Sequence, residues 1–160
     1  MIRSGIGYDI HALSKGEKLI IGGVNIPSEI GSVGHSDGDA LSHSIVDALL
    51  GAAALGDIGG FFPSHEQEWK DARSIFFIKQ AVEKISKADF EISNLDSTVI
   101  LQKPKIARFI PLIRRTLSEA ININESQISI KATTSDHLGF IGNNSGWASQ
   151  TIATIYKSID

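Results

Sequence analysis

Cysteine is absent from the 160-residue chain, and so is any excess of positive charge. Without cysteine there are no disulfide bonds, thiolate metal sites or thiol nucleophiles, so any metal must be held by His, Asp or Glu. The chain has 15 Lys and Arg residues against 18 Asp and Glu, which gives a formal net charge of −3. This balance lacks the basic surface typical of nucleic-acid-binding proteins, and we expect no nucleic-acid partner.

Long hydrophobic runs are also missing. The longest nearly uncharged stretch, residues 48–58, is too short and too rich in glycine and alanine to cross a bilayer. The N-terminal residues contain no apolar core of a signal peptide, and no transit peptide is evident. We therefore expect a protein of the bacterial cytoplasm that has no membrane partner.

The composition is that of one globular domain. Hydrophobic residues make up 42% of the chain and charged residues 21%, which is enough for a full core at this length. No repeat, low-complexity tract or linker divides the sequence. We expect a single domain over residues 1–160.

The spacing of apolar residues predicts the secondary structure. Strands are expected over residues 2–13, 18–21, 90–101, 127–134 and 146–159, with a short extension over residues 25–27. Helices are expected over residues 37–55, 71–87 and 104–121, the last opened by Pro104, and residues 56–68 form a loop. This order predicts an α+β domain in which helices cover one face of a mixed β-sheet.

Three residues have the spacing of a metal site. Asp9 and His11 are two positions apart on a predicted strand, so both side chains point to the same face. His43 lies on a predicted helix, where Asp39 and Asp47 share its side. A strand packed beside that helix brings Asp9, His11 and His43 together as three zinc ligands with an open fourth position. Asp39 is then suited to orient a histidine. The alternatives are a hydrogen-bonded core histidine or a simple His43–Asp47 pair.

Other segments carry groups suited to a phosphorylated sugar. Residues 34–39 precede a helix, where free N–H groups favour an anion, and His35 and Ser36 are donors there. Asp57 can accept hydrogen bonds from a sugar, and the hydroxyls and carboxylate of residues 131–136 suit a diphosphate or magnesium. Each segment also has a structural interpretation, as a capped turn, a helix end or a capped strand end.

The order of these motifs resembles a known family. The motifs are YDIH at residues 8–11, GGV at 22–24, the block 35–59 that contains DALLGAAALGDIG, and KATT at 131–134. Over essentially its whole length, the chain resembles the 2-C-methyl-D-erythritol 2,4-cyclodiphosphate synthases of the non-mevalonate isoprenoid pathway. The resemblance implies that 4-diphosphocytidyl-2-C-methyl-D-erythritol 2-phosphate is converted to a cyclic diphosphate. Its 2-phosphate attacks the β-phosphorus, and CMP leaves.

The resemblance also implies an assembly and metal ions. Family members are homotrimers with active sites between neighbouring subunits, and each site uses one zinc ion and a magnesium or manganese ion. Asp9, His11 and His43 match the zinc ligands. Asp136 stands near the position of the second metal and is a candidate magnesium ligand.

Further positions match catalytic and substrate-binding residues of the family. His35 and Thr134 match positions that stabilise the transition state. The implied substrate contacts are Asp9, His11, His35, Ser36, Asp57, Gly59, Phe62, Ser64, Leu101, Pro104, Lys105, Ile106, Ala107, Thr133, Thr134, Phe140 and Asn143. Among these, Asp57 and Gly59 lie near the ribose, and residues 101–107 bind cytosine mostly through backbone groups.

Four positions depart from the family pattern. They are Gly5 in place of a common His, Ser64 in place of Asp, Asp136 in place of Glu, and Asn143 in place of Arg. Two rival functions stay open at this point. One is a zinc-dependent phosphohydrolase in which Asp39 or Asp57 is the general base. The other is a silent oligomer that binds cytidine nucleotides or isoprenoid diphosphates.

Overall fold

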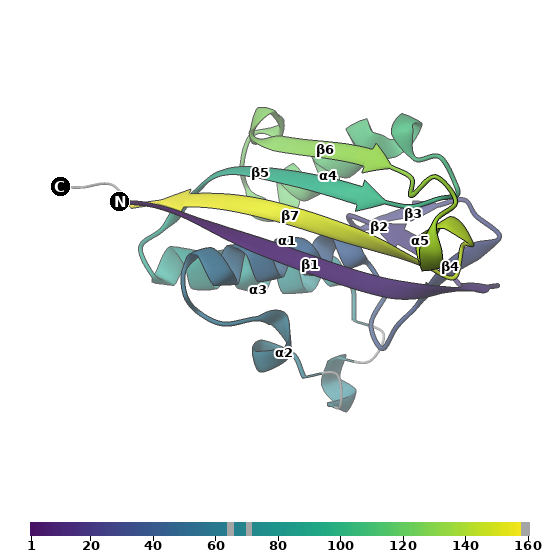
Figure 1. Cartoon of the computed structure of the whole chain (residues 1–160). Helices are drawn as coiled ribbons and strands as arrows, with labels where there is room; N and C mark the ends of the chain where they lie inside the picture. The colour runs from purple at the N-terminus through teal and green to yellow at the C-terminus, as the bar shows by residue number, and fades with distance from the viewer. Residues whose placement is uncertain (64–65, 70–71, 158–160) are drawn as a thin grey trace.

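The computed structural model describes residues 1–63, 66–69 and 72–157. Its main element is a five-stranded sheet with the order β4-β1-β7-β5-β6 (Figure 1). The strands are β1 (Ile2–Lys15), β4 (Ile30–Val33), β5 (Glu91–Ile100), β6 (Ile128–Thr133) and β7 (Gly146–Tyr156). Only the β5–β6 pair is parallel among these neighbours, so the sheet is mixed, and the predicted α+β class is confirmed.

The first and last strands of the chain are neighbours in this sheet. β1 pairs antiparallel with β7 from Ile2 opposite Tyr156 to Ala12 opposite Gly146. The N-terminal amino group donates to the carbonyl of Lys157 at 3.0 Å. Both ends of the chain therefore lie at the same end of the sheet (Figure 1).

A second, two-stranded sheet consists of β2 (Leu19–Ile21) and β3 (Val24–Ile26). Gly22 and Gly23 join these strands with φ angles of 58° and 76°. A two-residue hairpin turn with two positive φ angles favours glycine at both positions, which explains the Gly-Gly pair.

Three longer helices cover one face of the five-stranded sheet (Figure 1), and they are α1 (Ala40–Ala52), α3 (Ser74–Lys87) and α4 (Ile110–Ile121). α1 packs directly on β1 and β7 and is buried on most of its sides. α3 and α4 present one apolar face each to the core. Among the described residues, no helix is long and apolar enough to cross a membrane.

The two faces of the sheet differ sharply along β1. Gly5 and Gly7 face α1, and a Cβ atom added to either residue would meet the helix backbone. The alternate residues Ile6, Tyr8 and Ile10 point away from the helices and are 61%, 54% and 43% exposed. We call this second side the open face.

Several element boundaries differ from the sequence prediction. The helix expected from residue 104 begins at Ile110, because Pro111 and not Pro104 occupies its first turn. The helix expected over residues 37–55 covers only Ala40–Ala52. Several short elements were not predicted, namely β4, α2 (Ile58–Phe61), α5 (Gly139–Gly142) and the 3-10 helices η1 (Gln67–Trp69) and η3 (Glu125–Gln127). The expected helix start at Asp71 and the expected strand end at residues 158–159 lie outside the described residues.

Candidate metal centre and nucleotide pocket

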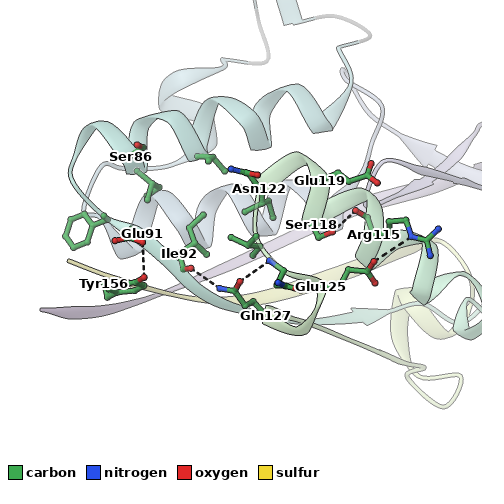
Figure 2. A pocket seen from close by; sticks show the side chains of 16 residues that line it. Ser86, Glu91, Ile92, Arg115, Ser118, Glu119, Asn122, Glu125, Gln127 and Tyr156 are labelled. Atoms are coloured by element: carbon green, nitrogen blue, oxygen red, sulfur yellow. Dashed lines mark hydrogen bonds and ion pairs between the residues drawn. The ribbon is translucent and has the colours of Figure 1, made fainter. Parts of the chain in front are cut away.

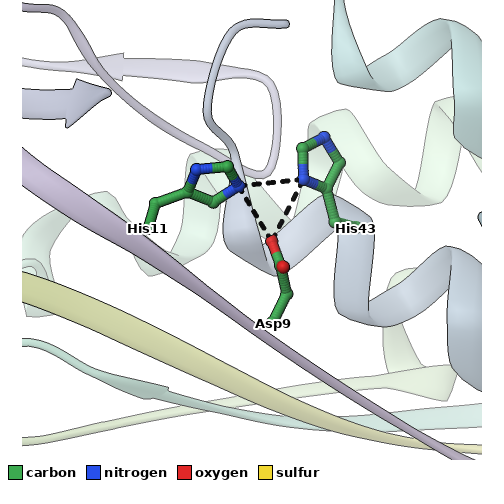
Figure 3. Close-up of side chains that lie close together, drawn as sticks. All are labelled: Asp9, His11 and His43. Atoms are coloured by element: carbon green, nitrogen blue, oxygen red, sulfur yellow. Dashed lines mark hydrogen bonds and ion pairs between the residues drawn. The ribbon is translucent and has the colours of Figure 1, made fainter. Parts of the chain in front are cut away.

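Asp9, His11 and His43 converge in the structure (Figure 3). The Oδ2 atom of Asp9 lies 3.0 Å from Nε2 of His11 and 3.1 Å from Nδ1 of His43. The two imidazole nitrogens are 3.2 Å apart. A tetrahedral zinc ion with bonds of about 2.1 Å holds its ligand atoms about 3.4 Å from one another. The donor set and its spacing therefore fit zinc.

Hydrogen bonds orient the two histidines. Nδ1 of His11 lies 3.0 Å from the carbonyl oxygen of Val33. A carbonyl oxygen only accepts, so Nδ1 carries a proton, and Nε2 is the nitrogen that would offer its lone pair to a metal at the centre of the triad. His43 shows the reverse arrangement, because its Nδ1 faces Asp9 and its Nε2 lies 3.3 Å from the hydroxyl of Ser36. Each ring thus directs one nitrogen to the same point.

The triad is electrostatically coupled. Burial raises the pKa of Asp9, but the hydrogen bonds and charges of His11 and His43 outweigh it and hold this pKa well below its usual range. Burial lowers the pKa of His11, but the hydrogen bond and charge of Asp9 raise it above its usual value overall. Asp9 is therefore an anion at neutral pH and is available to a cation.

Asp39 has a different role from the one expected. Its carboxylate makes no hydrogen bond to the ring of either histidine, and the residue is fully buried as the N-cap of α1. Its carboxylate accepts five hydrogen bonds, from the backbone of Gly22, Gly23 and Ser42 and from the hydroxyls of Ser42 and Ser74. These bonds tie the β2–β3 turn to the starts of α1 and α3. The carbonyl of Val33 takes over the orienting role predicted for Asp39.

A cavity of about 280 Å³ surrounds the triad. Its lining includes seven sequence-predicted residues, which are Asp9, His11, His35, Ser36, His43, Gly59 and Phe62. The sequence analysis missed the other three lining residues, Ile58, Trp69 and Phe77. The rings of Trp69 and Phe77 pack on Phe62 at centroid distances of 5.2 and 4.7 Å. The signal that could have found them is the density of aromatic residues between positions 61 and 77.

The expected ribose contacts lie at the edge of this cavity. Asp57 is the N-cap of α2 and accepts a hydrogen bond from the N–H of Gly60 at 2.8 Å. Asp47 on α1 accepts from the N–H of Ile58 at 2.7 Å, so α1 carries both His43 and the support for this turn. Ser64, another expected contact, lies outside the described residues.

A second cavity of about 210 Å³ gathers the residues expected around the cytosine base. The expected residues in its lining are Leu101, Pro104, Lys105, Ile106, Ala107, Thr133 and Thr134. Gln102 and Ala132, which belong to the expected segments 101–107 and 131–136, complete it. The pocket forms because the parallel strands β5 and β6 end side by side, so the segments that follow them meet.

The remaining expected residues are near this pocket in sequence but do not line it. Asp136 is exposed, has a φ angle of 49° and donates its N–H to the hydroxyl of Thr134 at 3.3 Å. Phe140 lies on α5 and is 45% exposed. Asn143 follows α5 and accepts from the N–H of Ser145 at 2.9 Å. In one chain, the structure does not bring these three residues to the triad.

A larger cavity, of about 840 Å³, lies between α3 and α4 and contains none of the expected residues (Figure 2). Its polar side chains bond to one another. The hydroxyl of Tyr156 donates to Glu91 at 2.9 Å, and Arg115 lies 3.6 Å from Glu125. Because this cavity contains neither the three triad residues nor His35 and Ser36, its size alone does not make it the functional site.

Comparison with known proteins identifies the family of this chain. Residues 2–156 match the YgbB family. The chain belongs to the YgbB family. One YgbB relative, the 2-C-methyl-D-erythritol 2,4-cyclodiphosphate synthase of Clostridium perfringens, is 48% identical over 98% of this chain and 100% of its own. These matches confirm the resemblance and the cyclodiphosphate synthase activity that it implied.

Solved structures of the same fold agree. The bifunctional IspDF of Campylobacter jejuni matches with a TM-score of 0.95 and 37% identity, over 99% of this chain and 43% of that chain. This chain therefore spans less than half of that two-function protein. A Plasmodium falciparum IspF structure described as a CDP complex matches with a TM-score of 0.87 and 37% identity, over 99% of this chain and 97% of its own.

Proposed function

We propose that this member of the YgbB family converts 4-diphosphocytidyl-2-C-methyl-D-erythritol 2-phosphate to 2-C-methyl-D-erythritol 2,4-cyclodiphosphate and CMP. An oxygen of the 2-phosphate forms a bond to the β-phosphorus, and the bond from that phosphorus to the CMP oxygen breaks. The observation that carries this proposal is the Asp9–His11–His43 triad, whose ligand atoms lie 3.0–3.2 Å apart in a cavity bordered by His35 and Ser36.

The reaction requires charge neutralisation, because two anionic phosphates approach each other and an anion leaves. Zinc held by Asp9, His11 and His43 supplies Lewis-acid stabilisation of phosphate charge when it is bound. His35 and Ser36 border the same cavity and serve as hydrogen-bond donors to phosphate oxygens. We assign a magnesium or manganese ion to the carboxylate of Asp136.

The nucleotide half of the substrate is assigned to the pocket between residues 101–107 and the end of β6. The CDP complex of the Plasmodium falciparum relative supports a cytidine nucleotide as the ligand. Thr133, Thr134 and Lys105 border this pocket. We assign them to contacts with the diphosphate of the substrate. Fixing both ends of the substrate holds the 2-phosphate beside the diphosphate, which makes the attack effectively intramolecular.

The two halves of the site do not meet within one chain. Ile10, Ala148, Ile100 and Thr133 form one row across β1, β7, β5 and β6. Three strand spacings of about 4.8 Å separate the ends of this row by about 14 Å. The row belongs to the open face, whereas Asp9 and His11 alternate with Ile10 and point to the other face. The sheet itself separates Thr133 from the triad, so a second copy is needed to supply Thr133.

The open face provides the surface for such a copy. Ile2, Ile6, Tyr8, Ile10 and Ile152 are all exposed on β1 and β7. A contiguous apolar area of this kind on a sheet marks an interaction surface. We propose that it packs against further copies in the homotrimer that the family resemblance implies, with each active site shared between neighbours. The cytoplasmic location stays a prediction from the sequence.

The hydrolase alternative requires a general base beside the metal. Asp39 is fully buried, and five donors already use its two oxygens. Asp57 accepts the N–H of Gly60. Neither carboxylate is directed at the triad, so the geometry favours the cyclising reaction over hydrolysis.

Phosphorus NMR of the products tests the proposal directly. The protein is incubated with the cytidylyl substrate, zinc and magnesium. We expect cyclic diphosphate and CMP in equal amounts. Linear phosphates would show that water reaches the phosphorus and would overturn the cyclisation. Absence of turnover by the zinc-loaded protein would instead favour a binding role.

A further inference from the structure

The contact between β1 and α1 is a direct contact of backbones. A Cβ atom added to Gly7 would lie 1.9 Å from the carbonyl oxygen of Ser44 and 2.8 Å from the backbone nitrogen of Ala48. These atoms belong to the helix backbone, so no change of rotamer can relieve the overlap. Any side chain at position 7 forces the strand and the helix apart.

This contact lies beside the metal ligands on both elements. Gly7 is two residues before Asp9 and shares its face of β1, and Ser44 follows His43 directly on α1. The hydroxyl of Ser44 lies 3.1 Å from that of Ser149 and 2.9 Å from that of Thr151 on β7. Position 44 is thus held against two strands, and Ser149 is the cross-strand neighbour of Asp9.

We propose that Gly7 and Ser44 are positioning residues, because their backbone contact and the bonds of the Ser44 hydroxyl to β7 together set the distance of His43 from Asp9 and His11. The inference rests on the proposed zinc site. An added Cβ needs at least about 3.0 Å from the Ser44 oxygen, so the two backbones must separate by about 1 Å. Metal–ligand distances tolerate only about 0.2 Å, and the three ligand atoms now lie 3.0–3.2 Å apart.

The chain offers a matched comparison. A Cβ atom on Gly5 would lie 2.1 Å from the carbonyl oxygen of Ala48 and 2.4 Å from the nitrogen of Ala52. That overlap is as severe as the one at Gly7, but it falls farther along α1 from His43. Gly51, also on α1, has nothing within 4 Å of an added Cβ.

Zinc affinity of the metal-free protein, measured by competition with a chromogenic chelator, tests the proposal without substrate. Urea unfolding of the same zinc-free samples measures stability. We expect Gly7→Ala and Gly5→Ala to lose similar stability, but Gly7→Ala alone to bind zinc 10- to 100-fold more weakly. Gly51→Ala should match the wild type in zinc affinity and should be no less stable, because alanine favours a helix more than glycine does. Equal zinc affinities for Gly7→Ala and Gly5→Ala would overturn the positioning role.

Ser44→Ala keeps the test decisive if Gly7→Ala does not fold. This variant removes the hydroxyl bonds to β7 without adding an atom, and we expect a three- to tenfold loss of zinc affinity. Ser97→Ala is its control, because Ser97 bonds to the same Thr151 hydroxyl at 2.8 Å from β5. Wild-type affinity in Ser44→Ala would overturn the proposal. Wild-type protein that binds no zinc would instead overturn the zinc site itself.

Discussion

The two faces of the five-stranded sheet use the same strands for opposite purposes. On the covered face, Gly5 and Gly7 carry no side chain, and α1 approaches until backbones touch. On the open face, Ile6, Tyr8 and Ile10 keep large side chains that stay exposed among the described residues. Strand alternation puts both patterns into one stretch of seven residues. The covered face thus carries the residues of the triad, and the open face is the surface that we propose packs against another copy.

His43→Ala is the strongest test of the covered face. The variant loses one of three zinc ligands, so we expect zinc binding to be abolished and turnover to fall by about 1,000-fold or more, with the oligomer retained. Metal analysis of the purified protein and the NMR product assay measure both effects. His137→Ala, at an exposed histidine beyond β6, should keep its zinc. Zinc at full stoichiometry in His43→Ala would remove His43 from the ligand set.

Ile6→Asp tests whether the open face is the interface between copies. A carboxylate in an apolar interface loses its hydration without gaining a partner, so we expect the oligomer to dissociate at least about 100-fold more readily. Each chain should still bind zinc, because Ile6 points away from the triad. Sedimentation velocity gives the oligomeric mass. Leu112→Asp, at a 49% exposed leucine on α4, is the control and should leave the assembly intact. An unchanged mass for Ile6→Asp would contradict the proposed interface.

Asp39→Ala tests how the covered side is held together. In this variant, five hydrogen-bond donors lose the buried carboxylate that accepts from them. We therefore expect the free energy of unfolding to fall by about 3 to 5 kcal/mol. Urea denaturation measures it. Glu83→Ala, which breaks an exposed pair with Lys87, should change stability by less than about 0.5 kcal/mol. A loss below about 1 kcal/mol for Asp39→Ala would show that these bonds matter little.

Asp136→Ala affects only the nucleotide half of the site. We expect the magnesium concentration for half-maximal turnover to rise by about tenfold, because a carboxylate near the second metal is lost. Zinc affinity should not change, since Asp136 lies apart from the triad in each chain. An unchanged magnesium titration would remove Asp136 from the site.

Asp37→Asn gives the smallest expected effect. Burial raises the pKa of Asp37 above its usual value, and the charge of Asp39 adds to this. The folded state therefore holds this proton to a higher pH than the unfolded chain, so the contribution of Asp37 to stability falls as pH rises above about 4. An amide can still accept the N–H of Ser74 and does not titrate. We expect the free energy of unfolding of Asp37→Asn, relative to that of the wild type, to rise by less than about 1 kcal/mol between pH 4 and pH 7. Urea denaturation at each pH measures this difference. Parallel pH profiles would contradict this assignment.

The sequence predicted the elements that carry local patterns. Two-residue spacing placed Asp9 and His11 on one face of a strand, and the apolar repeat placed His43 on the helix that packs beside it. The structure brings these three side chains together. Their role as zinc ligands stays a prediction, as do the substrate contacts.

The sequence alone did not reveal features that depend on distant contacts. In the sequence, Asp39 resembles an ordinary helix cap. Only the fold brings the N–H of Gly22 and the hydroxyl of Ser74 to its carboxylate oxygens. β4 contains Gly31 and Ser32, which have little strand preference, and it is a strand because it pairs with the end of β1. The helix after residue 104 was placed too early because both Pro104 and Pro111 fit a helix start.

The position of β7 has a consequence for biosynthesis. β7 is made after the other four strands of the sheet, yet it lies in the middle of that sheet between β1 and β5. Until residue 146 has been made, β1 has no long antiparallel partner and α1 has only part of its platform. The sheet therefore closes only when nearly the whole chain is available, over a sequence separation of about 150 residues, which is the arrangement that slows folding most. A chain that stops before β7 lacks the strand that joins its two halves.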